Sequence, residues 1–217
     1  MRTIIFDFDG TIADSFAAVI GIVYRVTKKE ELADANKVHT LLNSHAGLRE
    51  AIKSLDIPRW QRSWLIKKGR NILAKDILSV PLFEGMDQAL VRLSQSKFEL
   101  YIVSSNSKRN VERFLASRGI LGEFKAVYGG AGLFNKDQLI RRVLKSNHLS
   151  PKSTVYVGDE VRDIEAAKRV DMPVIAVSWG YNTEKLLLQH QPTVLARSPQ
   201  QLADIIIGWD EINLTEV

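Results

Sequence analysis

Short apolar runs that stop abruptly at acidic or hydroxyl side chains recur along this chain, and they constrain its fold most. The first run covers residues 4–6 and ends at Asp7, with Asp9 and Gly10 close behind. A short apolar run bounded by glycine is typical of a buried strand, and open α/β sheets bind ligands at the carboxyl ends of their strands. Gly10 permits the bend that two converging carboxylates require, since successive strand residues face opposite ways. The alternative is a polar turn without chemistry.

Beyond residue 80 the pattern alternates between short strands and helices. Strands are predicted over residues 99–103, 125–128, 154–157, 173–177 and 193–195. Helices are predicted over residues 86–93, 111–115 and 136–146, from about residue 163, and over 201–207. Strands joined by crossover helices form parallel sheets with helices on both faces. The sequence therefore predicts an α/β fold built on a doubly wound parallel sheet.

Residues 15–80 interrupt this alternation with a block that is helical throughout. Ser15 is a plausible N-cap for a first helix, which is followed by helices over residues 48–55 and from Pro58. We therefore predict a small all-helical cap domain over residues 15–80, inserted after the first strand. The core domain would comprise residues 1–14 and 81–217, with residues 81–85 as the exit hinge.

Charge and composition limit the classes of partner. The predicted insertion holds twelve Lys or Arg against six Asp or Glu, which exceeds the net charge of +5 of the whole chain. Such an excess favours anionic substrates or nucleic acid, or it is simply a solvated helix surface. Basic stretches interleaved with aromatic residues are missing, so we expect no nucleic-acid partner.

The chain has no cysteine and neither a signal-like start nor a membrane-length apolar run, so we expect a cytoplasmic protein without membrane contact.

Polar residues follow three of the predicted strands, where a parallel sheet would bring them to one edge. They are Asp7 and Asp9, then Ser104 and Ser105, then Asp159 with Glu160 and Asp163. Clustered carboxylates repel one another by about 4 kcal/mol for each pair about 4 Å apart at an effective dielectric constant near 20. An oxygen-only ligand set of this kind suits Mg²⁺, which also accepts substrate phosphate oxygens. Lys136 is the natural second countercharge.

Four segments in this order resemble the motifs of the haloacid dehalogenase superfamily. They are DFDGT after the first strand, the strand-terminal serine of IVSSN, the downstream Lys136, and GDEVRD after a later strand. The tracts PLFEGMDQALVRL and GDEVRDIEAAK look most like the phosphoglycolate phosphatase-like branch. The resemblance implies a Rossmann-like core with a helical cap, and a Mg²⁺-dependent phosphatase acting on a small phosphorylated metabolite.

The resemblance also implies a role for each matching residue. Asp7 is the nucleophile that forms an aspartyl-phosphate, and Asp9 is the general acid/base. Ser104 binds the phosphoryl oxygens and Lys136 neutralises charge. The metal site comprises Asp7, the backbone carbonyl of Asp9, Asp159 and Asp163, while Thr11, Ser105, Asn106 and Arg49 are assigned to substrate binding. Asp163 would support the metal through water or orient Lys136.

Two departures from the family pattern and two alternative functions stay open. Glu160 stands where Ser or Thr is more common, and it would tighten metal binding or face a backbone amide. Asp137 follows Lys136 where Pro is common. A phosphosugar mutase would use the same residues, and a binding module could reuse the scaffold without catalysis. The sequence leaves both a monomer and a homodimer open.

Overall fold

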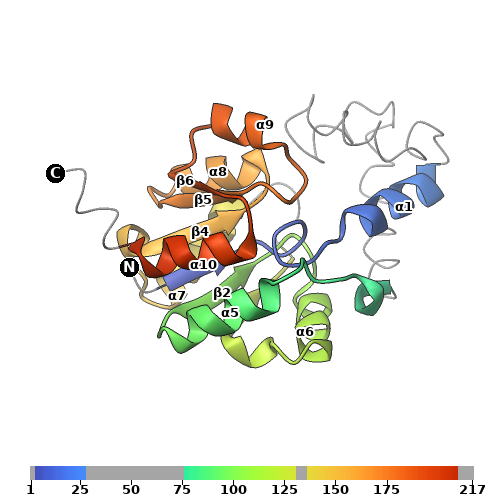
Figure 1. Ribbon diagram of the computed structural model, residues 1–217, viewed down its shortest axis with the longest axis horizontal. Coiled ribbons are helices and arrows are strands. Elements are labelled where there is room, and N and C mark those ends of the chain that lie inside the picture. The colour runs from blue at the N-terminus through green and yellow to red at the C-terminus, as the bar shows by residue number, and fades with distance from the viewer. Residues whose placement is uncertain (1–2, 28–75, 131–135, 210–217) are drawn as a thin grey trace.

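The computed structural model describes residues 3–27, 76–130 and 136–209, and a parallel sheet lies at its centre. Within these ranges the sheet has six strands in the order β3-β2-β1-β4-β5-β6, and every neighbouring pair is parallel (Figure 1). The strands are β1 (Thr3–Phe6), β2 (Glu99–Val103), β3 (Phe124–Tyr128), β4 (Thr154–Gly158), β5 (Val174–Val177) and β6 (Val194–Ala196). The predicted parallel sheet is confirmed.

Helices cover both faces of the sheet. One face carries α5 (Met86–Gln95), α6 (Lys108–Ser117) and α10 (Pro199–Ile207), and the other carries α7 (Lys136–Ser146), α8 (Val161–Lys168) and α9 (Glu184–Gln189). In Figure 1, α5 and α10 lie side by side, where Arg92 of α5 pairs with Asp204 of α10. The chain is therefore doubly wound, as the alternating pattern predicts.

The alternation of strand side chains divides the apolar core into two layers. Ile4 and Phe6 of β1 pack in the layer beneath α5, α6 and α10, while Ile5 packs in the layer beneath α7, α8 and α9. All three are fully buried, and each contributes about 1.5–3 kcal/mol through burial. Asp7 comes two residues after Ile5, so it continues toward the α7 and α8 face.

The segment that leaves the sheet and the segment that returns to it lie next to each other. The segment before α1 (Phe16–Thr27) runs beside the segment that follows η2 (Ile77–Ser79). The N–H of Asp14 donates to the Pro81 carbonyl at 2.9 Å, and Ala13 and Leu82 form an antiparallel bridge. This arrangement suits an insertion between these two segments. The helices predicted within residues 28–75, and Arg49 with them, lie outside the described residues.

Several elements differ from their predicted bounds or escaped prediction. Helix α6 begins at Lys108, not residue 111, because Ser107 caps a polar first turn by accepting the N–H of Asn110. Helix α8 begins at Val161, and α9 was not predicted. The short 3₁₀ helices η3 (Leu121–Glu123) and η4 (Pro151–Ser153) were not predicted either, whereas η2 lies within the block 15–80 that was predicted to be helical. Each 3₁₀ helix has only three residues, too few for the apolar periodicity by which a helix is recognised in the sequence.

Candidate active site

Asp7 extends from the carboxyl end of β1 into the interior. Its N–H donates to the Val157 carbonyl of β4 at 2.8 Å, and its side chain is only 1% exposed. The turn that follows requires glycine, because Gly10 has a φ of 80°. A Cβ at Gly10 would also lie 2.2 Å from a carboxylate oxygen of Asp159. Gly10 thus allows the β1 and β4 ends to approach each other.

Lys136, the first residue of α7, supplies the cation beside Asp7. Its Nζ atom lies 2.6 Å from Asp7 Oδ2 and also pairs with Asp163 Oδ1. The ammonium group lies 5.5 Å from the ring centroid of Tyr156. Burial alone would lower the pKa of Lys136, but Asp163 and Asp7 raise it above its ordinary value. Lys136 therefore stays charged, and the countercharge predicted from sequence lies against the first acidic residue.

Asp159 follows β4 and is held by groups that carry no charge. The Thr11 hydroxyl donates to Asp159 Oδ1 at 2.8 Å, and the Tyr181 N–H donates to Oδ2 at 2.8 Å. A Cβ at Gly180 would lie 2.2 Å from the Asp159 Cβ, so the loop after β5 packs directly on this side chain. Thr11 is fully buried here, and its substrate-binding assignment stays a prediction.

Asp163, on the first turn of α8, completes the acidic group. Its Oδ2 atom accepts the N–H groups of Asp159 and Glu160, each at 3.1 Å, while Oδ1 pairs with Lys136. Gly158 leaves room for it, since a Cβ there would lie 2.4 Å from Asp163 Oδ2. Of the two roles predicted for Asp163, its contacts match the orientation of Lys136.

Three carboxylates are thereby gathered at one point. Oxygen atoms of Asp7, Asp159 and Asp163, all buried, lie within 4.8 Å of one another. Burial raises the pKa of Asp7 to about 7 against the lowering effect of Lys136. Burial, with Glu160 and Asp163 next to it, raises the pKa of Asp159 well above its ordinary value. Such crowded oxygen donors fit a small, hard divalent cation, which would relieve their repulsion.

Glu160 and Arg162 form an ion pair next to this cluster. Glu160 is fully buried, and the guanidinium of Arg162 contacts its carboxylate. Arg162 also lowers the pKa of Asp7 through its charge, after the larger effects of burial, Lys136 and Asp163. The Glu160 side chain also accepts the backbone N–H of Asp163 in a capping box, so the prediction that it faces a backbone amide is confirmed, while its cationic neighbour was not predicted.

Asp9 lies on the other side of the cluster with neutral hydrogen-bond partners. The Asn106 side-chain amide donates to Asp9 Oδ2 at 3.3 Å. Burial raises the pKa of Asp9, and hydrogen bonding from Ser15 and Asn106 lowers it in part. The Ser104 hydroxyl oxygen accepts the Asn106 N–H at 2.9 Å, which leaves its own proton free for donation.

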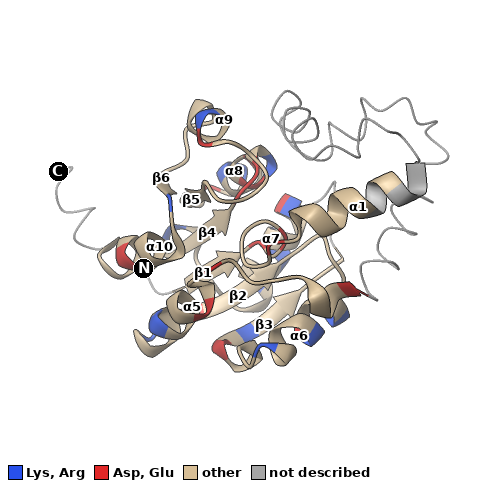
Figure 2. Cartoon of the chain, turned by 45° about the vertical axis from the view of Figure 1, so that its right-hand side comes forward, with Lys and Arg blue, Asp and Glu red and all other residues tan. Residues whose placement is uncertain are grey.

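The residues predicted from three strand ends therefore meet at one edge of the sheet. Figure 2 shows acidic segments beside α7 and α8, at the end of the sheet from which α1 leaves. Ser105 is half-buried after β2. Sequence reasoning missed Ser15, Arg162, Tyr181 and Asn182, whose amide oxygen accepts the Val161 N–H at 2.9 Å. The available signal was the stretch SWGYN, which follows the predicted strand 173–177 at the same edge.

Comparison with known proteins fits this geometry. A family model described as haloacid dehalogenase-like hydrolase matches residues 4–177. The chain belongs to the haloacid dehalogenase-like hydrolases. The resemblance inferred from four sequence motifs is confirmed.

Individual relatives within the haloacid dehalogenase-like hydrolases cover almost the whole chain. A phosphoglycolate phosphatase from Synechococcus elongatus is 29% identical over 95% of this chain and 97% of its own length. A pyrophosphatase from Listeria welshimeri is 23% identical over 95% of this chain and 96% of its own. The solved structure of a haloacid dehalogenase-like family hydrolase from Streptococcus pneumoniae has a TM-score of 0.75 at 21% identity, covering 95% of this chain and 98% of that one. The predicted enzyme class, a hydrolase of the phosphatase type, is confirmed.

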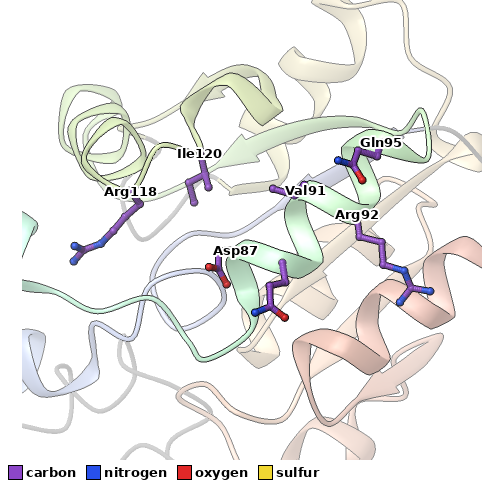
Figure 3. Close-up of a pocket in the computed structure, with 7 residues that line it drawn as sticks. Asp87, Val91, Arg92, Gln95, Arg118 and Ile120 are labelled. Atoms are coloured by element: carbon purple, nitrogen blue, oxygen red, sulfur yellow. The ribbon is translucent and has the colours of Figure 1, made fainter.

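A separate hollow lies away from the acidic cluster of this hydrolase. It has a volume of about 400 Å³ and is lined by residues of α5 together with Arg118 and Ile120 (Figure 3). None of the predicted site residues lines it.

Among the helices that the structure describes, none has the length and apolarity needed to cross a membrane.

Proposed function

We propose that this hydrolase is a Mg²⁺-dependent phosphomonoesterase that acts through an aspartyl-phosphate on Asp7. The observation that carries the proposal is the contact of 2.6 Å between Lys136 Nζ and Asp7, beside the carboxylates of Asp159 and Asp163. A carboxylate is a nucleophile that needs no activating base once it is ionised. It must, however, approach an anionic phosphoryl group, so it needs cations close by.

In the first half-reaction Asp7 attacks the phosphorus atom. A bond forms between a carboxylate oxygen of Asp7 and phosphorus, and the bond from phosphorus to the ester oxygen breaks. Asp9 donates its proton to the departing oxygen, which leaves as an alcohol. Burial of Asp9, which raises its pKa, favours the protonated form required for this step.

In the second half-reaction water releases the phosphate. Asp9, now ionised, accepts a proton from water as the water oxygen bonds to phosphorus. The bond between phosphorus and the Asp7 oxygen then breaks, which restores the Asp7 carboxylate and frees inorganic phosphate. Dividing the hydrolysis in this way replaces one difficult displacement by two easier ones.

The remaining site residues orient and neutralise the phosphoryl group. Lys136 lies where it can pair with a phosphoryl oxygen as well as with Asp7, and the free hydroxyl proton of Ser104 can bond to another. Asp7, Asp159 and Asp163, with the Asp9 carbonyl, would hold Mg²⁺, which when bound would supply charge neutralisation at the phosphoryl oxygens. Burial of these groups strengthens each electrostatic contact.

The proposed substrate is a small phosphorylated metabolite of the phosphoglycolate or sugar-phosphate type. Support comes from the length match to the Synechococcus phosphoglycolate phosphatase, while the Listeria relative is named for pyrophosphate. In the proposed domain division, residues 15–80 form a helical cap over a core of residues 1–14 and 81–217. Arg49 of the cap would bind a second anionic group of the substrate.

A screen of phosphorylated metabolites for phosphate release tests the proposal. We expect release that requires Mg²⁺, stops with a chelator and returns on adding Mg²⁺. Isomerised sugar phosphate without free phosphate would indicate a mutase instead. Release that persists undiminished in chelator, or no release from any phosphomonoester, would contradict the proposal.

A further inference from the structure

Tyr181 joins two parts of the molecule that meet at the acidic cluster. Its N–H donates to Asp159 Oδ2 at 2.8 Å, and its hydroxyl lies 2.9 Å from the hydroxyl of Ser15. Its ring packs edge-on against Phe16 of α1, with ring centroids 5.6 Å apart. Tyr181 is 2% exposed and Ser15 is fully buried. Tyr181 thus links the start of α1 to Asp159, which follows β4.

The segment held by Tyr181 is the one that carries Asp9. Asp9 and Ala13 form a parallel bridge, and the Ala13 carbonyl accepts the N–H groups of Gly10 and Ser15, each at 2.9 Å. The turn from Asp9 to Ser15 is therefore closed on itself. A shift of Ser15 would move the Asp9 side chain with it.

The hydroxyl groups of Tyr181 and Ser15 lie next to each other on the segment that leads to Asp9. A serine hydroxyl has a single proton, and an ionised carboxylate only accepts hydrogen bonds. Either hydroxyl of the Tyr181–Ser15 pair can donate to the other, and hydrogen bonding from Ser15 lowers the pKa of Asp9. In the order Tyr181, Ser15, Asp9, each hydroxyl would donate to the next group along the chain.

We propose that Tyr181 is a positioning residue, which holds Ser15 and the start of α1 so that Asp9 is aligned for proton transfer. The inference rests on the proposed function, because only there does Asp9 exchange protons with substrate and water. Tyr181 acts through Ser15 and touches no reacting atom. Its backbone N–H, which no substitution except proline removes, keeps Asp159 in place independently.

Two variants separate this role from a general loss of structure. Tyr181→Phe retains the ring and the N–H but removes the hydroxyl, and Ser15→Ala removes its partner. Tyr101→Phe is the matched control, because Tyr101 is also buried and, among the described residues, its hydroxyl bonds to Glu99 on the same strand β2, at 3.5 Å. Each variant, the double variant and the wild type are assayed for kcat, KM and Mg²⁺ affinity with one phosphomonoester.

We expect Tyr181→Phe and Ser15→Ala each to lower kcat roughly tenfold, as for the loss of one aligned hydrogen bond. KM and Mg²⁺ affinity should change less than about twofold, a separation that a loosened core would not produce. The double variant should be no slower than the single variants, because both substitutions break one chain.

Three results would overturn the inference. Tyr181→Phe could match Tyr101→Phe in kcat, the two single effects could multiply in the double variant, or Mg²⁺ affinity could fall in step with kcat. Failure of the proposed function is distinguishable from these, because then the wild type itself would release no phosphate.

Discussion

The two sides of the acidic cluster hold their carboxylates by different means. On the charged side, Asp7 and Asp163 both pair with the buried Lys136. On the neutral side, Asp9 accepts a hydrogen bond from Asn106, and hydrogen bonding from Ser15 and Asn106 lowers its pKa more than the nearby cations do. A nucleophile must be ionised and a general acid must carry a proton, so one site has to offer two environments. The side with the cation suits the nucleophile Asp7, and the side with neutral partners suits the general acid Asp9.

The largest expected effect is on the charged side. Asp7→Asn retains the shape of the side chain but removes the nucleophilic carboxylate, so kcat should fall by about 10⁴-fold or more. Phosphate release from p-nitrophenyl phosphate with Mg²⁺ measures this. Asp87→Asn, at an exposed position on α5, is the matched control and should keep the wild-type rate. A wild-type rate in Asp7→Asn would remove the assignment of the nucleophile.

The corresponding change on the neutral side should depend on the leaving group. Asp9→Asn cannot donate a proton, so kcat for an alkyl phosphate should fall by about 10²–10⁴-fold. With p-nitrophenyl phosphate the first half-reaction should slow less, because p-nitrophenolate leaves without a proton. Rapid-quench measurement of the alcohol or p-nitrophenol released in the first turnover compares the two substrates. An equal loss of the first-step rate for both would show that Asp9 does not protonate the leaving oxygen.

Removing the shared cation should damage both activity and stability. Lys136→Met leaves Asp7 and Asp163 buried without their partner, which costs about 3–5 kcal/mol of the free energy of unfolding. The loss of one preorganised donor should also lower kcat by about 10²–10³-fold. Urea denaturation and phosphate release measure the two effects. Lys125→Met, at an exposed lysine 3.8 Å from Glu99, should change neither by much, and equal behaviour of the two variants would contradict the account.

A smaller effect is expected from the groups that orient Asp159. Thr11→Val keeps the side-chain shape and removes the hydroxyl that donates to Asp159 at 2.8 Å. Loss of such a supporting hydrogen bond lowers metal affinity by about 10-fold or somewhat more. Isothermal titration with Mg²⁺ gives the affinity. An unchanged dissociation constant would show that Asp159 is not a ligand or needs no such support.

The last prediction concerns pH. Burial raises the pKa of Asp7 from 3.8 to about 7 in the metal-free protein, so between these values the folded state binds more protons than the unfolded state. The free energy of unfolding should therefore fall as the pH rises through this window. Mg²⁺ binds the ionised carboxylates, so its stabilising effect on Tm should be larger at about pH 8 than at about pH 5. Thermal denaturation with and without Mg²⁺ measures this, and an equal rise in Tm at both values would contradict it.

The sequence predicted the sheet and the charged side well because both follow from short-range patterns. The runs that became β1, β2 and β4 are apolar and end in polar residues, and parallel topology brings those ends together. Lys136 lies where the downstream lysine of the family motif was placed, and its contacts with Asp7 and Asp163 follow from the packing of α7 and α8 on one face.

On the neutral side the sequence named Asp9 and Asn106 as site residues, but it could not predict the contact of Ser15 with Tyr181, which joins residues far apart in the sequence. The Ser15 hydroxyl meets Tyr181, 166 residues away, and neither residue type signals this by itself. Ser15 was interpreted as a helix cap from its place before an apolar period. Arg162 is part of the GDEVRD segment, yet its pairing with Glu160 depends on the rotamers chosen in the folded site.

Trapping the covalent intermediate tests the central claim most directly. Acid quenching during turnover with Mg²⁺, followed by borohydride reduction, converts an aspartyl-phosphate to homoserine, which mass spectrometry locates in the sequence. We predict homoserine at position 7, dependent on substrate and absent from Asp7→Asn. Turnover at a normal rate with no modified residue at position 7, or with homoserine at another aspartate, would contradict the account.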